Sequence, residues 1–234
     1  TNINTGSNRN MSDRLRQMAT NAAETAVSLT RPSYFDSKER GELPELRQEL
    51  LSDTYIIRRE AVRKVIAGMT AGGGKDDYGE LFPEILRCLQ SKDVETKRLV
   101  YLYLTTYAEE RPDMALLAVN TFVKDSEDKS NAVVRSLALR TMGGLRIPNL
   151  VDYIDDPLRR AIRDDNFMVR RTAAICIGKL FVNHREYFDD MELACALQLL
   201  LSDADPFVAS NAVAVLLQHY DDGLSQLIDI DSTL

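Results

Sequence analysis

The stretch VRRTA at residues 169–173 decides the fold, because versions of it recur at nearly constant spacing along the 234-residue chain. The other copies are IRREA (57–61), TKRLV (96–100), VRSLA (134–138) and VASNA (208–212). Their last residues are successively 39, 38, 35 and 39 positions apart. A period of this length is typical of repeating pairs of α-helices, stacked so that each pair packs on the next.

The chemistry of the pattern fits a packed helix face. A residue and the one four positions later lie on the same face, one turn apart, and a small final residue lets a neighbouring helix approach closely. The second position points away from that face and is basic in four copies: Arg58, Lys97, Arg135 and Arg170, with Ala209 in the last. A polar residue suited to the first turn or the N-cap precedes each copy: Asp53, Asp93, Ser130, Asp165 and Asp205.

We therefore predict an all-α protein, an α-solenoid of the HEAT or armadillo type with about five helix pairs. Apolar periodicity and Gly or Pro breakers place the pairs at 42–52 with 55–69, 78–90 with 93–109, 113–124 with 131–143, 150–163 with 166–182, and 190–201 with 205–220. We expect residues 1–30 to form a tail that is disordered at its start, in which Met11–Leu29 is either a marginal helix or disordered, and residues 31–234 to form the solenoid.

Composition narrows the possible functions. The net charge of −7 and a pI near 5.0 argue against nucleic acid as a general partner, since phosphate binding needs a basic surface. The sequence contains no run of about 18 apolar residues, which is the length that a membrane-spanning helix needs. The three cysteines, Cys88, Cys176 and Cys195, each lie in an apolar helical run, so we expect buried, reduced thiols.

No pattern in the chain predicts catalysis, a cofactor or a metal. The run Gly72–Lys75 lacks the first glycine of a phosphate-binding loop, because Met69 stands there. The two histidines, His184 and His219, are 35 residues apart and belong to separate repeats. No Cys or His spacing matches a zinc site. We therefore expect a binding protein and not an enzyme.

Several stretches resemble one family, the amino-terminal trunk of the β-type large subunit of clathrin adaptor complexes (β-adaptin). The matching strings run in register from about Tyr34 to Tyr220. They are YF (34–35), KERGEL (38–43), EAVRKVIAGMT (60–70), LFPE (81–84), KRLVYLYL (97–104), RPDMALLAVNTFVKD (111–125), RSLALRTM (135–142), VRRTAA (169–174) and SNAVA (210–214).

The resemblance implies a scaffold for vesicle-mediated and intracellular protein transport. Its partners would be a second large, a medium and a small adaptor subunit, together with an Arf-family GTPase and phosphoinositide membranes reached through the complex. The complex would be cytoplasmic, peripheral on trans-Golgi, endosomal or plasma-membrane coated vesicles. In the family clathrin is bound by a hinge and ear beyond the trunk, so these residues are not expected to bind it well.

Three groups of site residues carry over from the resemblance. Tyr34 and Phe35 match an aromatic pair that covers the dileucine cargo pocket of a neighbouring subunit, or they pack on the first helix pair. A stretch that helps to hold anionic lipid corresponds to Arg58, Arg59, Arg63 and Lys64, but Tyr55–Ile57 stand where the family has more lysines.

The third group lies on the predicted helix at 113–124. Leu116 and Val119 match the helix that meets an Arf-family GTPase, or they belong to the core, with the core favoured for Val119. Leu117 and Phe122 are expected in the core. The period alone also allows a different helical-repeat scaffold, such as a nuclear transport receptor or a phosphatase scaffold. The strings quoted above favour the adaptor family over that alternative.

Overall fold

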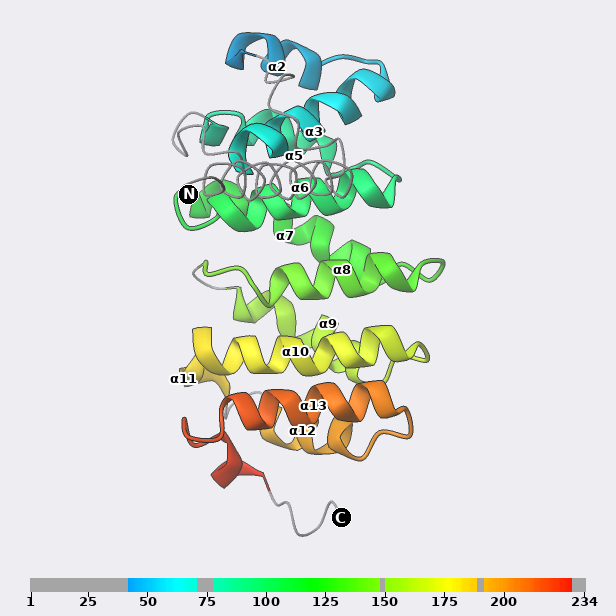
Figure 1. Cartoon of the computed structure of the whole chain (residues 1–234), viewed down its shortest axis with the longest axis vertical. Helices are drawn as coiled ribbons and strands as arrows, with labels where there is room; N and C mark the ends of the chain where they lie inside the picture. Colours follow the sequence, from blue (N-terminus) through cyan, green and yellow to red (C-terminus); the bar gives the residue numbers. More distant parts are fainter. Residues whose placement is uncertain (1–41, 71–77, 148–149, 189–191, 229–234) are drawn as a thin grey trace, which may run out of the picture.

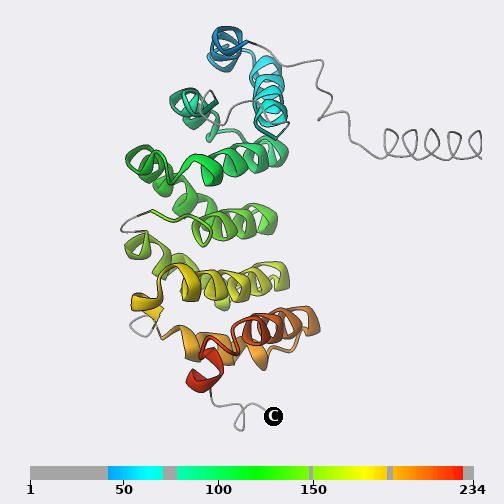
Figure 2. The same cartoon turned by 60° about the vertical axis from the view of Figure 1, so that its left-hand side comes forward.

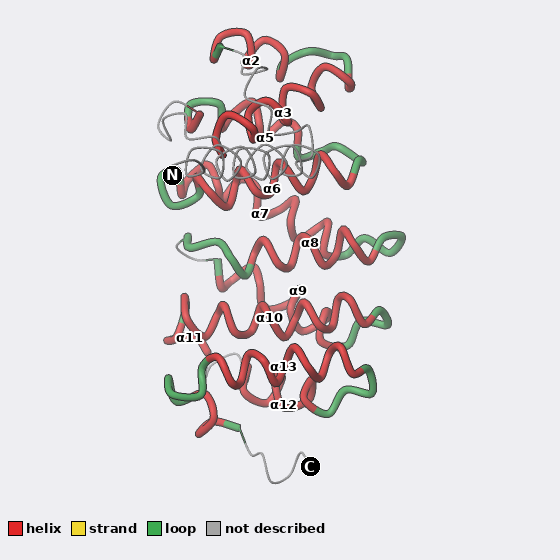
Figure 3. The backbone as a smooth tube through the Cα atoms, viewed as in Figure 1, coloured by secondary structure: helices red, strands yellow, loops and turns green. Residues whose placement is uncertain are grey.

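The computed structural model of this protein describes residues 42–70, 78–147, 150–188 and 192–228. Tyr34, Phe35, the Met11–Leu29 stretch and the Gly72–Lys75 run lie outside the described residues. Within the described ranges every regular element is helical (Figure 3).

Five helix pairs make up the described chain, as the sequence predicts. The first helices are α2 (Leu43–Leu50), α5 (Phe82–Cys88), α7 (Pro112–Ser126), α9 (Val151–Ile162) and α12 (Leu193–Leu201). The second helices are α3 (Tyr55–Thr70), α6 (Val94–Tyr107), α8 (Ala132–Met142), α10 (Phe167–Asn183) and α13 (Pro206–Gln218). Each boundary lies within four residues of the predicted one. The short α11 (Arg185–Phe188) and the 3-10 turn η3 (Leu224–Leu227) were not predicted.

The pairs stack in two layers along one long axis (Figures 1 and 2). Second helices contact one another in the order α3, α6, α8, α10 and α13, and first helices α2, α5, α7 and α9 contact one another on the other side. The described core therefore runs along the stack and has no single centre. Stability in such an array is roughly a sum over repeats and their interfaces.

Side-chain caps fix where four of the second helices begin. Asp93 and Asp205 accept hydrogen bonds from the backbone N–H of Thr96 and Phe207, as the sequence predicts. For α8 and α10 the prediction is off by one residue, because the caps are Asn131 and Asn166 and not the residues before them. The amide oxygen of asparagine caps a helix as well as serine or aspartate does, so the cap can lie one residue later than predicted.

The small residues of the repeated pattern lie at the helix contacts. Ala61, Ala138, Ala173 and Ala212 are fully buried, and so is Val100 in the one copy with a larger residue. At the α10–α13 contact, a Cβ on Gly178 would lie only 2.8 Å from a methyl of Val215. The second helices thus approach one another as closely as the pattern predicts.

Three expected core positions are wrong. Leu117 is 68% exposed and Cys195 is also exposed, while the first residue of the first copy, Ile57, is 42% exposed. Leu117 and Cys195 lie on the outer sides of α7 and α12, because the residues two positions before them, Ala115 and Leu193, face the core. Runs of consecutive apolar residues hid which face is inward.

Candidate functional site

The second residue of the repeated pattern forms an ion pair with the next repeat in three of the five copies. These pairs join Lys97 to Asp125, Arg135 to Asp164 and Arg170 to Asp203, and we call them the ion-pair ladder. Each cation is the second residue of the repeated pattern, and each acid lies in the next repeat at or just after the end of its first helix. Arg135 and Arg170 each reach both carboxylate oxygens of their partner, at 2.8 and 2.8 Å and at 2.7 and 3.0 Å.

The same cations also hold the turn inside their own repeat. Arg135 donates to the carbonyl of Asp128 at 2.8 Å, and Arg170 donates to that of Asp164 at 2.9 Å. Arg58 makes the equivalent bond to Ser52 at 2.6 Å. Arg135 and Arg170 therefore fix two turns at once, one in their own repeat and one in the next.

Electrostatics in the ladder favour the charged forms. The hydrogen bond from Arg170 holds the pKa of Asp203 below its usual value, and the pKa of Arg170 is raised in turn. Burial pushes the pKa of Asp164 up, but hydrogen bonds from Arg135 and the Asn166 amide outweigh it, so the net shift is downward. Asp125 also accepts a hydrogen bond from the hydroxyl of Tyr101, whose own pKa burial raises.

Arg58 marks a gap in this ladder at the boundary between the first two repeats. Among the described residues its guanidinium has one hydrogen-bond partner, the Ser52 carbonyl, and no carboxylate. Ser91 stands where Asp164 and Asp203 stand in later repeats: it precedes the N-cap by two positions and accepts the N-cap N–H, here from Asp93 at 3.2 Å. No acid of the described residues therefore pairs with Arg58 in the way that Asp164 and Asp203 pair with Arg135 and Arg170.

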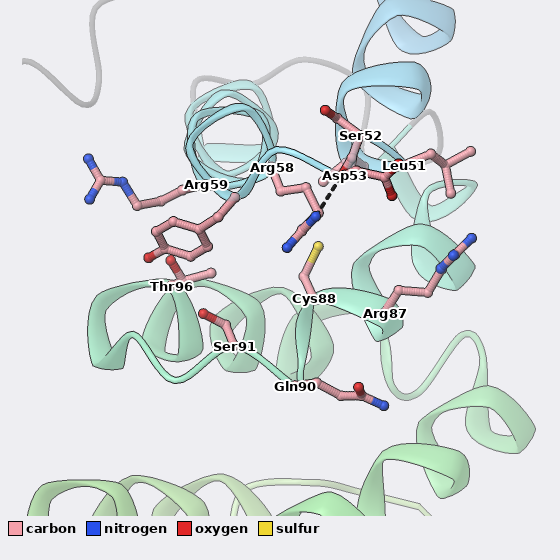
Figure 4. Close-up of a pocket in the computed structure, with 12 residues that line it drawn as sticks. Leu51, Ser52, Asp53, Arg58, Arg59, Arg87, Cys88, Gln90, Ser91 and Thr96 are labelled. Carbon is pink, nitrogen blue, oxygen red and sulfur yellow. Dashed lines mark hydrogen bonds between the residues drawn. The ribbon is translucent and has the colours of Figure 1, made fainter.

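A pocket of about 520 Å³ opens at this gap (Figure 4). Arg58 extends into it from α3, Cys88 and Ser91 line the opposite wall, and Arg87 stands at one side. The lining includes three arginines, Arg58, Arg59 and Arg87, against one carboxylate, Asp53. On a chain of net charge −7 this is a local positive site.

The four cations expected to hold anionic lipid are not equally available. Arg63 pairs with Glu60 at 2.5 Å and with Glu95 at 2.9 Å, and Lys64 pairs with Glu49 at 2.7 Å. Arg59 has a looser contact with Glu60 at 3.5 Å. The basic stretch is therefore largely neutralised by local acids, and its positive charge is concentrated at Arg58 and Arg59.

On α7 the residues matched to a GTPase-binding helix face inward to different degrees. Val119 is fully buried, and Leu116 is half-buried against the core. Phe122 is buried as expected, in edge-to-face contact with Tyr101 at 4.8 Å between ring centroids. The exposed apolar side chain on this helix is Leu117, which the sequence had assigned to the core.

In the described part of the chain, no group of three or more His, Cys, Asp and Glu residues could hold a metal ion. None of the helices in these ranges has both the length and the apolar character required to span a membrane.

Sequence reasoning placed the ladder cations off the packing face but missed their partners. A signal was present, because Asp125, Asp164 and Asp203 are each 39 residues apart. This spacing matches the repeat period, so a search for periodic acids beside the periodic cations would have found them.

Comparison with known proteins identifies one family over most of the chain. The family described as "Adaptin N terminal region" matches residues 37–229. The chain is 45% identical over 188 residues to AP-1 complex subunit beta-1 of Homo sapiens, which covers 80% of this chain and 19% of that protein. It is 41% identical over 182 residues to AP-1 complex subunit beta-1 of Saccharomyces cerevisiae, covering 78% and 24%. The chain thus spans about a fifth of the length of the relatives it matches.

Similar structures agree on the architecture. A homology model of the full-length AP-3 complex in an intermediate open conformation matches with a TM-score of 0.59 and 27% identity, over 87% of this chain and 34% of that one. Importin beta matches with a TM-score of 0.56 at 17% identity, over 87% and 26%, and shows the solenoid fold alone. The family match over residues 37–229 and the 45% identity show that this chain belongs to the adaptin family, with β subunits as its relatives.

Proposed function

We propose that this chain is part of the trunk of an adaptor-complex β subunit and acts as a scaffold without catalytic activity. In this role it helps to hold a four-subunit core that selects cargo and assembles coats in vesicle-mediated transport. The observation that carries the proposal is the family match together with 45% identity over 188 residues to an AP-1 beta subunit.

The ion-pair ladder supports a scaffold role. A solenoid contacts only its neighbours, so its stiffness depends on each inter-repeat interface. Polar links at three successive boundaries add directional contacts to the apolar packing. A stiff array keeps surface residues on different repeats at fixed separations, which a subunit that holds several partners requires.

Partner subunits would bind through apolar side chains left uncovered on the described surface. The large ones include Val182, Leu199, Phe207 and Leu217. Exposed apolar residues of this kind mark protein contacts when they gather in patches. Co-expression with a second large, a medium and a small adaptor subunit from the same organism, followed by size-exclusion chromatography, tests the role. Co-elution supports the proposal, and elution of this chain alone contradicts it.

We propose that α7 contacts an Arf-family GTPase through Leu116, with the exposed Leu117 beside it and the buried Val119 as support. Leu117→Arg should weaken binding of the GTP-loaded GTPase at least tenfold without affecting the fold, because the side chain is in solvent. The matched control is Leu102→Arg, another exposed leucine on a different helix. Equal loss in both variants, or no loss in either, would count against this contact.

Membrane attraction through Arg58, Arg59, Arg63 and Lys64 is proposed to be weak. A basic residue near an anionic surface contributes about 1 kcal/mol, and two of the four already pair with acids. Vesicles containing phosphoinositide should therefore retain the chain only at low salt. Arg58→Gln with Arg59→Gln should reduce that retention more than Arg63→Gln with Lys64→Gln, and the reverse order would contradict the assignment.

Tyr34 and Phe35 are proposed to cover the dileucine pocket of a neighbouring subunit. In the assembled complex, replacing both with alanine should increase the affinity for a dileucine peptide. An unchanged affinity would favour packing on the first helix pair. We propose that clathrin binds to parts of the protein beyond these residues, and that the complex lies at the cytoplasmic surface of coated vesicles.

A further inference from the structure

The gap in the ion-pair ladder at the boundary between the first two repeats has the features of a modification site. Arg58 occupies the same position in its repeat as Arg135 and Arg170, and makes the same bond to a carbonyl of its own turn. Ser91 lies 33 residues after Arg58, and Asp203 lies 33 residues after Arg170. A neutral hydroxyl thus stands where the last two boundaries have a carboxylate, Asp164 and Asp203.

We propose that Ser91 is a phosphorylation site, and that its phosphate supplies the anion missing from the ladder by pairing with Arg58. A protein kinase would transfer the γ-phosphoryl group of ATP to Ser91 Oγ. The new O–P bond replaces the bond to the departing ADP, and the hydroxyl proton is released. This inference does not rest on the proposed function, because it uses only the contacts of the first two repeats.

The charge around Ser91 suits a phosphate. Phosphoserine carries a charge of about −1.5 to −2 at neutral pH and three acceptor oxygens. Arginine meets phosphate with two parallel N–H donors, the geometry by which Arg135 and Arg170 grip their carboxylates. Arg58 extends into the pocket, Arg59 and Arg87 line its edges with their guanidiniums turned outward, and Asp53 is the one carboxylate among the lining residues (Figure 4). The nearby Asp93 carboxylate is occupied by the N–H and hydroxyl of Thr96.

Space and access also suit the modification. A phosphoserine side chain is longer than aspartate, and the pocket of about 520 Å³ between Ser91 and Arg58 provides room for it. Ser91 is half-buried in the turn between α5 and α6, next to exposed Gln90 and Lys92. Its hydroxyl accepts one bond, from the Asp93 N–H, and an ester oxygen can keep that bond.

The boundary between the third and fourth repeats has a more balanced set of charges than the first boundary. At the junction of the third and fourth repeats a pocket of about 500 Å³ is lined by Glu127, Asp164 and Asp165 together with Lys129, Arg135, Arg160 and Arg163. The charges there nearly balance, and Arg135 is already satisfied by Asp164. At the first boundary three arginines line the pocket against one carboxylate, Asp53, and no acid of the described residues pairs with Arg58, so an added phosphate would fill that place.

Stability measurements on the full chain with phosphoserine incorporated at position 91 test the pairing. The melting temperature should rise by roughly 3 °C relative to the unmodified chain. That gain should disappear in Arg58→Gln. Phosphoserine placed at the exposed Ser210 of α13 is the matched control, and its effect should not depend on Arg58. A second readout is the phosphate itself: its second pKa, about 6 when free, should fall beside Arg58 and return in Arg58→Gln.

Two results would overturn the proposal directly, and a third would point to a different ligand for the pocket. One is an equal effect of phosphoserine at position 91 in the presence and absence of Arg58. The other is mass spectrometry that finds no phosphate on Ser91 in the protein isolated from its own cells with phosphatases inhibited. Arg58-dependent binding of inorganic phosphate to the unmodified chain at submillimolar concentration would also count against it, because the pocket would then serve a diffusible anion.

Discussion

Arg170 grips Asp203 with two hydrogen bonds, 2.7 and 3.0 Å long, across the boundary between the fourth and fifth repeats. The same guanidinium donates to the Asp164 carbonyl at 2.9 Å, within its own repeat. One side chain therefore joins two turns, and Arg135 does the same one repeat earlier. The stack is held by these links as well as by its apolar core.

A double-mutant cycle on Arg170 and Asp203 should reveal this coupling. Both side chains are mostly buried, at 20% and 10% exposure, so the pair is screened less than a surface pair. We expect a coupling energy of roughly 1–2 kcal/mol from urea unfolding of Arg170→Ala, Asp203→Ala and the double variant. The exposed pair Arg146–Glu109 is the control and should show almost none. Equal coupling in both pairs would contradict a structural role for the ladder.

Lowering the pH should reduce the stability that the Arg170–Asp203 pair contributes to the folded protein. The pKa of Asp203 is lower in the folded protein than its unfolded value of about 3.9. The pair therefore contributes its full stability above that pH and loses it as the pH falls through the folded pKa. Asp203→Asn should be less stable than the unmodified chain at pH 7, and the two should converge as the pH falls through the folded pKa. Urea midpoints that stay equally far apart over this range would contradict the assignment.

The sequence predicted the helix pairs well, because burial of one face forces the 3.6-residue period and the small contact residues repeat. The faces of strongly apolar helices were harder. Leu116 and Leu117 are adjacent in α7, yet the first packs on the core and the second is 68% exposed. Which of two adjacent leucines faces inward depends on the helix orientation against its neighbours, and a single repeat does not encode it.

The candidate site was predicted only in part for a related reason. The pattern identifies Arg58, Arg135 and Arg170 as equivalent, but their partners come from the next repeat, 29 and 33 residues away in the two paired cases. That Arg58 pairs with no carboxylate of the described residues becomes visible only when the repeats are compared in three dimensions. The charge of Arg63 and Lys64 likewise looked available until Glu95 and Glu49 were placed beside them.

Gly178→Ala should destabilise the protein although alanine favours helices. The helix preference would gain up to about 1 kcal/mol. The added Cβ would lie 2.8 Å from Val215 at the α10–α13 contact, and overpacking of a core costs roughly 1–3 kcal/mol. Thermal unfolding should show a lower midpoint. Gly144→Ala is the control, since its Cβ first meets the flexible end of Lys179 at 3.1 Å. A higher midpoint for Gly178→Ala would disprove the tight contact.

Thiol labelling of the native protein should distinguish the three cysteines. Cys195 is exposed and should react with a maleimide at once. Cys88 and Cys176 are buried, and burial raises the pKa of both thiols, to about 12 for Cys176. Thiolate is the reactive form, so both should react only after unfolding in denaturant. Labelling of Cys176 at the rate of Cys195 would show that the α8–α10 interface is open.

The central claim is that this chain is a scaffolding part of an adaptor complex, and its most direct test is what it assembles with. We would purify the tagged full-length protein from its own cells and measure the stoichiometry of the proteins that co-purify by mass spectrometry. The account predicts a second large, a medium and a small adaptor subunit in equal amounts with it. Recovery of cargo receptors or a phosphatase, with none of those three subunits, would contradict it.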